Sequence, residues 1–159
     1  MTEWSTFLLG ELGAPSKHAF ATGPFGSSIS KKFFLDEGIP VIRGSNLSTE
    51  IEVTLNEEGL VFVDEEKAQK FSRSIARRGD LVFTCWGTVG QVGLISDTTR
   101  YDRYIVSNKQ MKMTPDPSRV EPLFLYYLLS SPRMVHEVTS QAIGTSVPGF
   151  NLVVCRGFG

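Results

Sequence analysis

The sequence has little of the chemistry on which most enzymes depend. It has only two cysteines, Cys85 and Cys155, and two histidines, His18 and His136. It contains no HExxH, CxxC, GxSxG or phosphate-loop pattern. The four His and Cys residues are too dispersed for the spacing of a structural zinc site. We therefore expect no metal, no cofactor and no catalysis.

One catalytic alternative stays open from the residues alone. Cys85 could be a nucleophile activated by His18 or His136, because such partners need only be close in space. A small thiol hydrolase of this kind would require an exposed Cys85 with a lowered pKa beside a histidine. The competing interpretation is a small, half-buried residue at the end of a strand.

Long hydrophobic runs are also missing. No segment approaches the roughly 18 to 20 apolar residues that cross a bilayer. The first residues include Glu3 and Glu11 and have no basic region typical of a secretory signal. Two cysteines far apart in such a chain do not predict a disulfide framework. We expect a soluble, cytoplasmic protein with reduced thiols.

What the chain does have is enough apolar material for one core. It has 159 residues, of which 41% are hydrophobic, and eleven are Phe. A chain of this size and composition can bury enough apolar area to offset the entropy of ordering. We therefore expect one folded domain and no disordered tail of biased composition.

Charge is balanced overall but unevenly distributed. The net charge is −1, yet residues Glu50–Glu66 hold seven acids and no Lys or Arg. Residues Lys67–Lys112 hold nine bases and only three acids. The acidic stretch is not expected to face DNA, whereas the basic stretch favours one basic face about as strongly as it favours scattered, solvated charge.

Hydrophobic periodicity and turn residues predict a mixture of strands and helices. Residues 39–42 form a β-branched run that ends in a turn, so Arg43 is expected at a strand end. Acids precede bases over Asp64–Ile75, which predicts a helix. The remaining expected elements are a short helix or strand at 4–12, a hairpin pairing 81–83 with 92–95, a strand over 104–113, and helices over 120–131 and 132–139.

Three glycine-containing loops offer backbone N–H groups and hydroxyls that can approach a phosphate closely. They are Gly23–Ser28, Thr84–Gly90 and Gly144–Phe150. Ordinary turn chemistry is an equal alternative for each loop. Phe25 and Trp86 lie in two of them, where an aromatic ring can stack on a base or bury inward, and inward burial is favoured.

The order of these elements resembles the target recognition domain of type I restriction-modification specificity subunits. Six stretches carry the resemblance, and together they span nearly the whole chain: GPFGSS (23–28), GIPVIRGSNL (38–47), EEKAQKFSRS (65–74), GDLVFTCWGTVGQVGLI (79–95), EPLFLYYLLSSP (121–132) and GTSVPGFNL (144–152). The family often has a basic or polar residue where this chain has Cys85 and Trp86. Base preference is not carried over, because in the family this region varies with the target.

The resemblance implies an α+β fold with a curved mixed β-sheet, partly barrel-like and flanked by α-helices. It implies a domain over residues 1–152 that reads one half of a bipartite DNA target, followed by a tail, 153–159, where the family's conserved spacer helix would begin. In the family, methyl transfer and cleavage belong to partner methyltransferase and restriction subunits, so the chain itself would be non-catalytic. Without the spacer helix, a competing function is protein–protein interaction with methyltransferase or full-length specificity subunits.

The candidate DNA-contacting residues are donors at strand ends and in loops, together with one aromatic side chain. Arg and Lys are assigned first to phosphates, and base contacts by Arg or Gln are secondary. The complete set is Arg43, Ser45, Asn46, Arg73, Arg77, Arg78, Thr84, Trp86, Thr88, Lys109, Gln110, Thr145 and Ser146.

Overall fold

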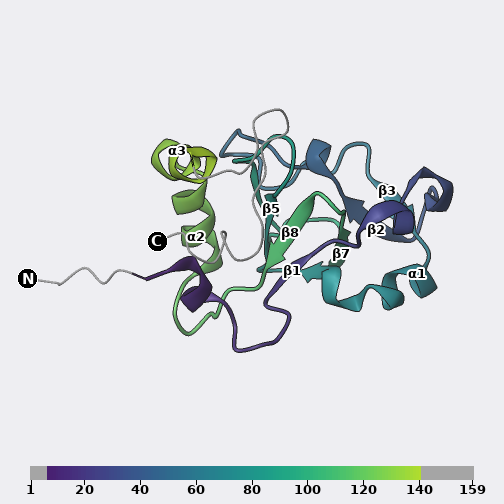
Figure 1. The fold of residues 1–159 in the computed structure, drawn as a ribbon, viewed down its shortest axis with the longest axis horizontal. Coiled ribbons are helices and arrows are strands. Elements are labelled where there is room, and N and C mark those ends of the chain that lie inside the picture. The colour runs from purple at the N-terminus through teal and green to yellow at the C-terminus, as the bar shows by residue number, and fades with distance from the viewer. Residues whose placement is uncertain (1–6, 141–159) are drawn as a thin grey trace, which may run out of the picture.

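The computed structural model describes residues 7–140, which form two four-stranded sheets with helices at both ends (Figure 1). The α+β class is therefore confirmed, with the strands divided between two sheets. One sheet is antiparallel, in the order β1 (Phe20–Thr22), β8 (Gln110–Met113), β5 (Leu81–Thr84) and β6 (Val92–Leu94). The other is mixed, in the order β3 (Val61–Val63), β2 (Ile39–Ile42), β7 (Arg103–Val106) and β4 (Ile75–Arg77).

A single parallel pairing decides where two loops emerge. Strands β2 and β7 are parallel, with Val41 opposite Ile105 and Ile42 opposite Val106. Their other neighbours, β3 and β4, pair with them antiparallel. Because parallel strands end at the same edge of a sheet, the residues after Ile42 and after Val106 leave the sheet side by side.

The two sheets share one of the hydrophobic clusters that form the core. Val82 of β5 lies in a cluster with Ile42 of β2 and with Tyr104 and Val106 of β7, and each of these side chains is fully buried. The β-branched and aromatic residues on these short strands supply the apolar area that such packing requires. The shared cluster fixes the ends of β2, β5 and β7 relative to one another.

Helices α2 (Pro122–Leu129) and α3 (Pro132–Ser140) lie at one end of the molecule, and α1 (Glu65–Lys70) lies at the other (Figure 1). The carboxylate of Glu121 caps α2 by accepting the Phe124 N–H at 2.8 Å, and Pro122 occupies the first turn, where its missing N–H costs nothing. The buried Tyr126 hydroxyl donates to the Ile51 carbonyl at 3.0 Å, tying α2 to the loop before β3. The two predicted C-terminal helices are thus confirmed.

The predicted helix over Asp64–Ile75 is too long. The α-helix ends at Lys70, the chain makes a 3-10 turn over Ser72–Ser74, and strand β4 begins at Ile75. Asp64 caps the helix as its position indicates, accepting the Lys67 N–H at 2.6 Å. The apolar spacing that favoured a longer helix arises because Ile75 and Ala76 are buried in a sheet.

The predicted strand over 104–113 is wrong as a single element. Two strands, β7 and β8, are separated by a turn in which the Gln110 N–H donates to the Ser107 carbonyl at 3.0 Å. The hairpin of β5 and β6 and the strand ending at Ile42 are confirmed. Of the predicted opening element, residues Leu9–Leu12 form a 3-10 turn. Further 3-10 turns lie at Gly26–Ser28, Lys31–Phe33 and Gly44–Asn46.

Candidate functional site

A cleft of about 590 Å³ opens where β2 and β7 of the mixed sheet and β5 of the antiparallel sheet end. Its walls come from the residues after β2, the loop between β5 and β6, and the turn between β7 and β8. The cleft brings together seven of the candidate residues that the sequence places in three separate segments: Arg43, Ser45, Thr84, Trp86, Thr88, Lys109 and Gln110.

The turn Ser107–Gln110 holds the loops around the cleft in place. The Lys109 carbonyl accepts the N–H of Cys85 at 2.7 Å and that of Trp86 at 3.3 Å. The Ser107 N–H donates to the Ile42 carbonyl at 3.0 Å, which extends the pairing of β2 with β7. Backbone bonds of this kind need no particular side chain, so the loop side chains stay available for contacts outside the chain.

The loop that begins at Gly23 is packed against the same turn. The Gly23 N–H donates to the Gln110 carbonyl at 3.1 Å. A Cβ atom on Gly23 would lie 2.0 Å from the Ser107 carbonyl oxygen, a distance that no side chain tolerates. Glycine at this position is therefore required by the close approach of two backbones.

Two residues that line the cleft, Arg43 and Gln110, have buried nitrogen atoms. Gln110 is 1% exposed, and its amide oxygen accepts the Ser107 hydroxyl. Among the described residues, neither the Gln110 Nε2 atom nor the buried Nε atom of Arg43 has a hydrogen-bond partner. The Arg43 Nη2 atom donates to the Gly59 carbonyl at 2.8 Å, so the guanidinium is anchored at its tip.

The rim of the cleft consists of exposed side chains. Ser45, Thr88 and Lys109 are exposed, and Trp86 keeps 41% of its surface accessible. Phe25, in the neighbouring loop, is 69% exposed, so the expected inward burial is wrong for this ring. Trp86, which lines the cleft, is thus also not buried inward, and an exposed ring there is suited to stacking on a flat ligand group.

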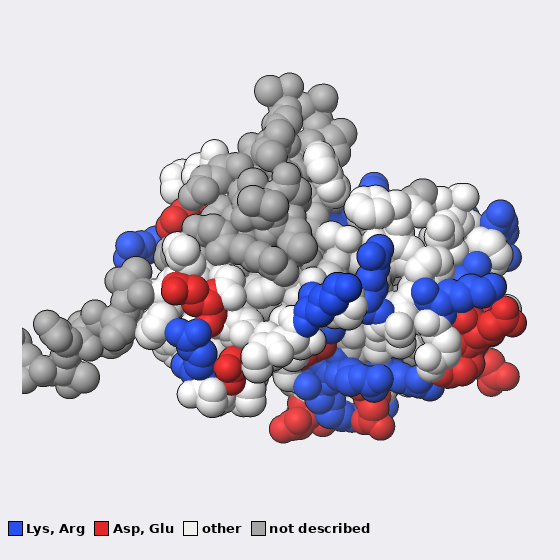
Figure 2. All heavy atoms as spheres, turned by 60° about the horizontal axis from the view of Figure 1, so that its bottom comes forward, with Lys and Arg blue, Asp and Glu red and all other residues white. Residues whose placement is uncertain are grey.

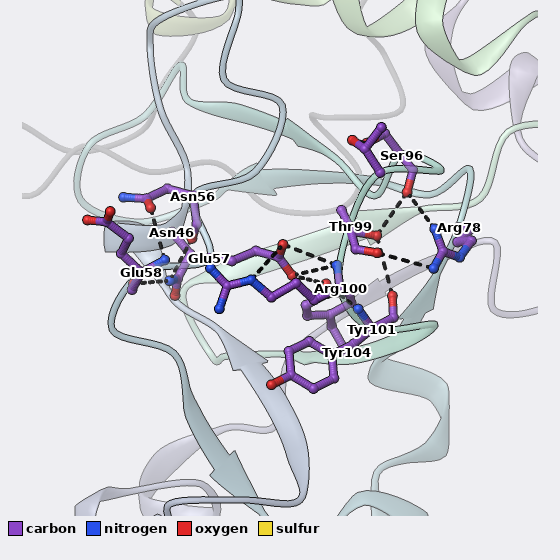
Figure 3. Close-up of polar contacts among 11 residues, drawn as sticks. Asn46, Asn56, Glu57, Glu58, Arg78, Ser96, Thr99, Arg100, Tyr101 and Tyr104 are labelled. Atoms are coloured by element: carbon purple, nitrogen blue, oxygen red, sulfur yellow. Dashed lines mark hydrogen bonds and ion pairs between the residues drawn. The ribbon is translucent and has the colours of Figure 1, made fainter.

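Thr84 and Asn46 have internal roles. Thr84 is 2% exposed, and its hydroxyl donates to Gln91 at 3.2 Å. Asn46 is fully buried, and its amide nitrogen donates to the carbonyl groups of Asn56 at 3.0 Å and Glu58 at 3.3 Å (Figure 3). Its oxygen accepts the Arg43 N–H at 3.0 Å. Asn46 therefore shapes the loop that carries Arg43 and Ser45, and its side chain is not presented to a ligand.

Arg78 is also committed to the protein. Its guanidinium donates to the Asp97 carbonyl at 2.6 Å and the Thr99 carbonyl at 3.2 Å, and it forms an ion pair with Asp102 at 2.9 Å (Figure 3 shows the contact with Thr99). These contacts fix the turn before β7. By contrast, Arg73 and Arg77 are exposed, and neither makes an ion pair within residues 7–140.

Much of the basic charge between Lys67 and Lys112 is paired with carboxylates. Three of the paired bases use the acidic stretch itself: Arg103 with Glu65 at 2.6 Å, Lys70 with Glu66 at 3.1 Å, and Arg100 with Glu57 at 3.8 Å. Figure 2 accordingly shows Lys and Arg side chains gathered across one face with Asp and Glu side chains close beside them. Folding thus partly compensates the uneven distribution of charge along the sequence, because the acidic and basic segments lie against each other.

Several buried groups away from the cleft have shifted pKa values. Burial raises the pKa of the Asp80 carboxyl and lowers the pKa of the Lys112 ammonium, although the two form an ion pair at 3.8 Å. Burial, followed by the hydrogen bond to Glu57, raises the pKa of Tyr104 to about 12. These groups support the sheets and do not line the cleft.

The sequence interpretation missed several cleft residues, among them Gly44, Gln91, Ser107 and Asn108. The polar run Ser107-Asn108-Lys109 is a turn signal that the prediction of one strand passed over. Thr145 and Ser146, together with the third glycine-containing loop and Cys155, lie outside the described residues.

The thiol hydrolase alternative does not fit the position of Cys85. Its side chain is 2% exposed, inside a cluster of apolar residues, whereas a reactive thiol must be accessible. Within residues 7–140, no group of His, Cys, Asp and Glu side chains is arranged to hold a metal ion. No helix in that part of the chain combines the length and apolarity needed to span a membrane.

Solved structures share this arrangement of strands and helices. The S subunit of a type I restriction-modification system from M. genitalium matches 98% of the chain with a TM-score of 0.61 and 13% identity. The HsdS subunit from Thermoanaerobacter tengcongensis matches 94% with a TM-score of 0.57 and 17% identity. The chain has the fold of part of a type I specificity subunit. A structure described for complex assembly and conformational transition of the type I R-M system agrees, with a TM-score of 0.62, 14% identity and 94% of the chain covered.

Sequence similarity points to the same group of proteins. The type I restriction enzyme EcoBI specificity subunit from Escherichia coli is 27% identical over 100 residues, which are 63% of this chain. No family model matches the chain. The chain spans 20% of the length of that specificity subunit and 31% to 34% of the three solved chains. The resemblance to a target recognition domain is thus confirmed, and it concerns one part of a specificity subunit.

Proposed function

We propose that this chain binds double-stranded DNA with the sheet edge that holds the cleft and reads one half of a bipartite target. The observation that carries the proposal is the convergence of Arg43, Trp86 and Lys109 on one cleft, from three segments of the chain. The fold shared with S subunits supports it, as does the similarity to a protein whose name describes it as a specificity subunit.

In this proposal, the residues divide by position. Lys109, at the exposed rim, binds phosphate, and the exposed Arg73 adds a further base. Arg77 pairs with Arg103 at the start of β7, the end of the sheet away from the cleft, so it lies apart from this surface. Ser45, Trp86 and Thr88 contact sugar or bases, and Arg43 and Gln110 act from inside the cleft. The chain itself catalyses no reaction, and methyltransferase and restriction subunits of the same system would be its partners.

Fluorescence anisotropy with a duplex of random sequence tests DNA binding directly. The logarithm of the binding constant should fall linearly with the logarithm of salt concentration, by about 0.9 per phosphate contact. Lys109→Ala should reduce that slope by about one contact. Arg100→Ala is the matched control, because Arg100 is 67% exposed and lies before β7, at the opposite end of the strand from Ser107. If the two variants reduced the salt slope equally, the proposed position of DNA at the cleft would be contradicted.

A second candidate function is contact with protein, and the outer face of α2 favours it. Leu123, Phe124, Tyr127 and Leu128 are each at least 42% exposed, and their spacing places them on one side of the helix. A methyltransferase or a full-length specificity subunit would be the partner. Association measured by sedimentation should then be insensitive to salt and weakened by Phe124→Glu, whereas the DNA complex should respond to salt and not to this variant.

A further inference from the structure

Gln110 lines the cleft, and its contact with Ser107 orients the amide so that, within residues 7–140, the buried nitrogen is an unused donor. Ser107 donates its hydroxyl hydrogen to the amide oxygen, and the Ser107 backbone is itself held by Ile42. The nitrogen is therefore left with its N–H groups unused by the described residues. A buried N–H group without a partner destabilises the folded chain unless a ligand accepts it.

Arg43 adds a second donor to the same cleft. Its Nη2 atom donates to the Gly59 carbonyl at 2.8 Å, and its Cζ atom lies 5.8 Å from the centre of the Phe34 ring. The Nε atom is buried and has no partner among residues 7–140. A guanidinium has only donors, so this position cannot satisfy a donor on a ligand.

The other described residues that line the cleft bring no carboxylate that could accept hydrogen bonds from these donors. None of the described residues around the cleft is Asp or Glu. The nearby polar pair is occupied, because Thr84 donates to the Gln91 amide oxygen and the Gln91 nitrogen donates to the Leu47 carbonyl at 3.0 Å. The ligand group that suits these donors is a hydrogen-bond acceptor.

We propose that the cleft reads guanine, with Gln110 Nε2 and Arg43 Nε donating to the O6 and N7 acceptors of its major-groove edge. This inference rests on the proposed DNA binding. In the major groove, guanine presents two adjacent acceptors, whereas adenine and cytosine each present an amino donor. Thymine offers a single acceptor beside a methyl group. A neutral amide at 1% exposure suits a base edge better than a phosphate, for which the exposed Lys109 at the rim is the better partner.

The test is selection of binding sites from a random duplex library by the wild-type chain and by three variants. Gln110→Met keeps the side-chain volume and removes the donor. Gln110→Glu keeps the shape and presents acceptors only. Gly44→Ala places a methyl group 3.5 Å from Gln110 Nε2, an ordinary contact distance that covers the donor without straining the fold.

The wild-type site should contain one guanine whose replacement by another base lowers affinity about tenfold, within the usual range for a bidentate contact. Gln110→Met and Gly44→Ala should lose the preference at that position alone, and Gln110→Glu should shift it toward cytosine or adenine. Replacing that guanine with 7-deazaguanine, which lacks the N7 acceptor, should weaken binding by the wild type.

Each other outcome overturns the inference in a recognisable way. An unchanged site for all three variants, or a wild-type preference for an amino-bearing base there, contradicts reading by Gln110 and leaves DNA binding intact. A uniform loss of affinity across sequences would mean that the cleft binds phosphate. No selected site and no salt-dependent binding for any folded chain, the wild type included, would contradict the proposed function itself.

Discussion

The guanidinium of Arg103 binds both oxygens of the Glu65 carboxylate, with N–O distances of 3.0 and 2.6 Å. This bidentate contact joins the first residue of β7 to the first turn of α1. It shows how the chain brings its acidic and basic segments together, and why surplus charge in a sequence does not measure the charge available to a partner. The side chains at the cleft rim are among those that folding leaves exposed for external contacts.

Arg78→Ala should destabilise the chain, whereas Arg77→Ala should not. Arg78 donates to several carbonyls and pairs with Asp102, so its loss should lower the free energy of unfolding by about 2 kcal/mol. Arg77 is exposed, and its removal should change that energy by less than about 0.5 kcal/mol. Urea denaturation measures both. Similar losses for the two variants would remove the structural role assigned to Arg78.

Asp80 and Lys112 should show strong coupling in a double-mutant cycle. Their side chains are 5% and 10% exposed, so removing one leaves the other buried without its counter-charge. Asp80→Asn or Lys112→Met alone should cost about 3 kcal/mol, and the double variant should cost clearly less than the sum. Additive losses would show that the two groups do not interact in the folded chain.

Tyr104 should make stability sensitive to alkaline pH. Its pKa of about 12 in the folded chain lies above the value of about 10 for an unfolded tyrosine. The folded state therefore holds this proton more tightly, so the contribution is fully present below about pH 10 and is lost as pH rises through about 12. Tyr104→Phe should flatten the fall in stability over that window. The ultraviolet titration of this variant should also lack the tyrosine ionisation at about pH 12. If that ionisation persists, it belongs to another tyrosine.

Gly23→Ala should disturb the cleft far more than Gly44→Ala. A methyl group on Gly23 would meet the Ser107 carbonyl oxygen at 2.0 Å, while one on Gly44 would be 3.5 Å from Gln110 Nε2. The first change must displace backbone and should lower the melting temperature by several degrees or more, as expected for a loss of about 1 to 3 kcal/mol. The second should leave it nearly unchanged. Thermal unfolding of both variants separates the two cases.

The sequence predicted the parts of the fold that depend on local signals. The Gly and Pro punctuation delimited the β5–β6 hairpin and the helices α2 and α3, and Arg43 was placed correctly at a strand end. The helix over Asp64–Ile75 was wrong because the burial of Ile75 in a sheet is set by tertiary packing, which local periodicity does not encode. The strand over 104–113 was wrong for another reason, since the polar turn signal Ser107-Asn108-Lys109 was passed over.

The candidate site was predictable as a set of residue types and only partly as a place. Polar and aromatic residues in loops and at strand ends identified half of the cleft residues, because loops at strand ends gather at one edge of a sheet. The internal roles of Asn46 and Arg78 were not predictable, since the carbonyl groups they bind lie 10 or more positions away along the chain. A polar side chain in a loop can serve the loop as readily as a ligand.

Hydrogen exchange of the chain with and without duplex DNA tests whether the cleft binds DNA. Exchange should slow in the presence of DNA at residues 43–47, 84–88 and 107–110, which surround the cleft, and stay unchanged at 97–102, the turn held by Arg78. Protection confined to 97–102, or no protection at the cleft under conditions where the duplex is bound, would contradict DNA binding at the cleft.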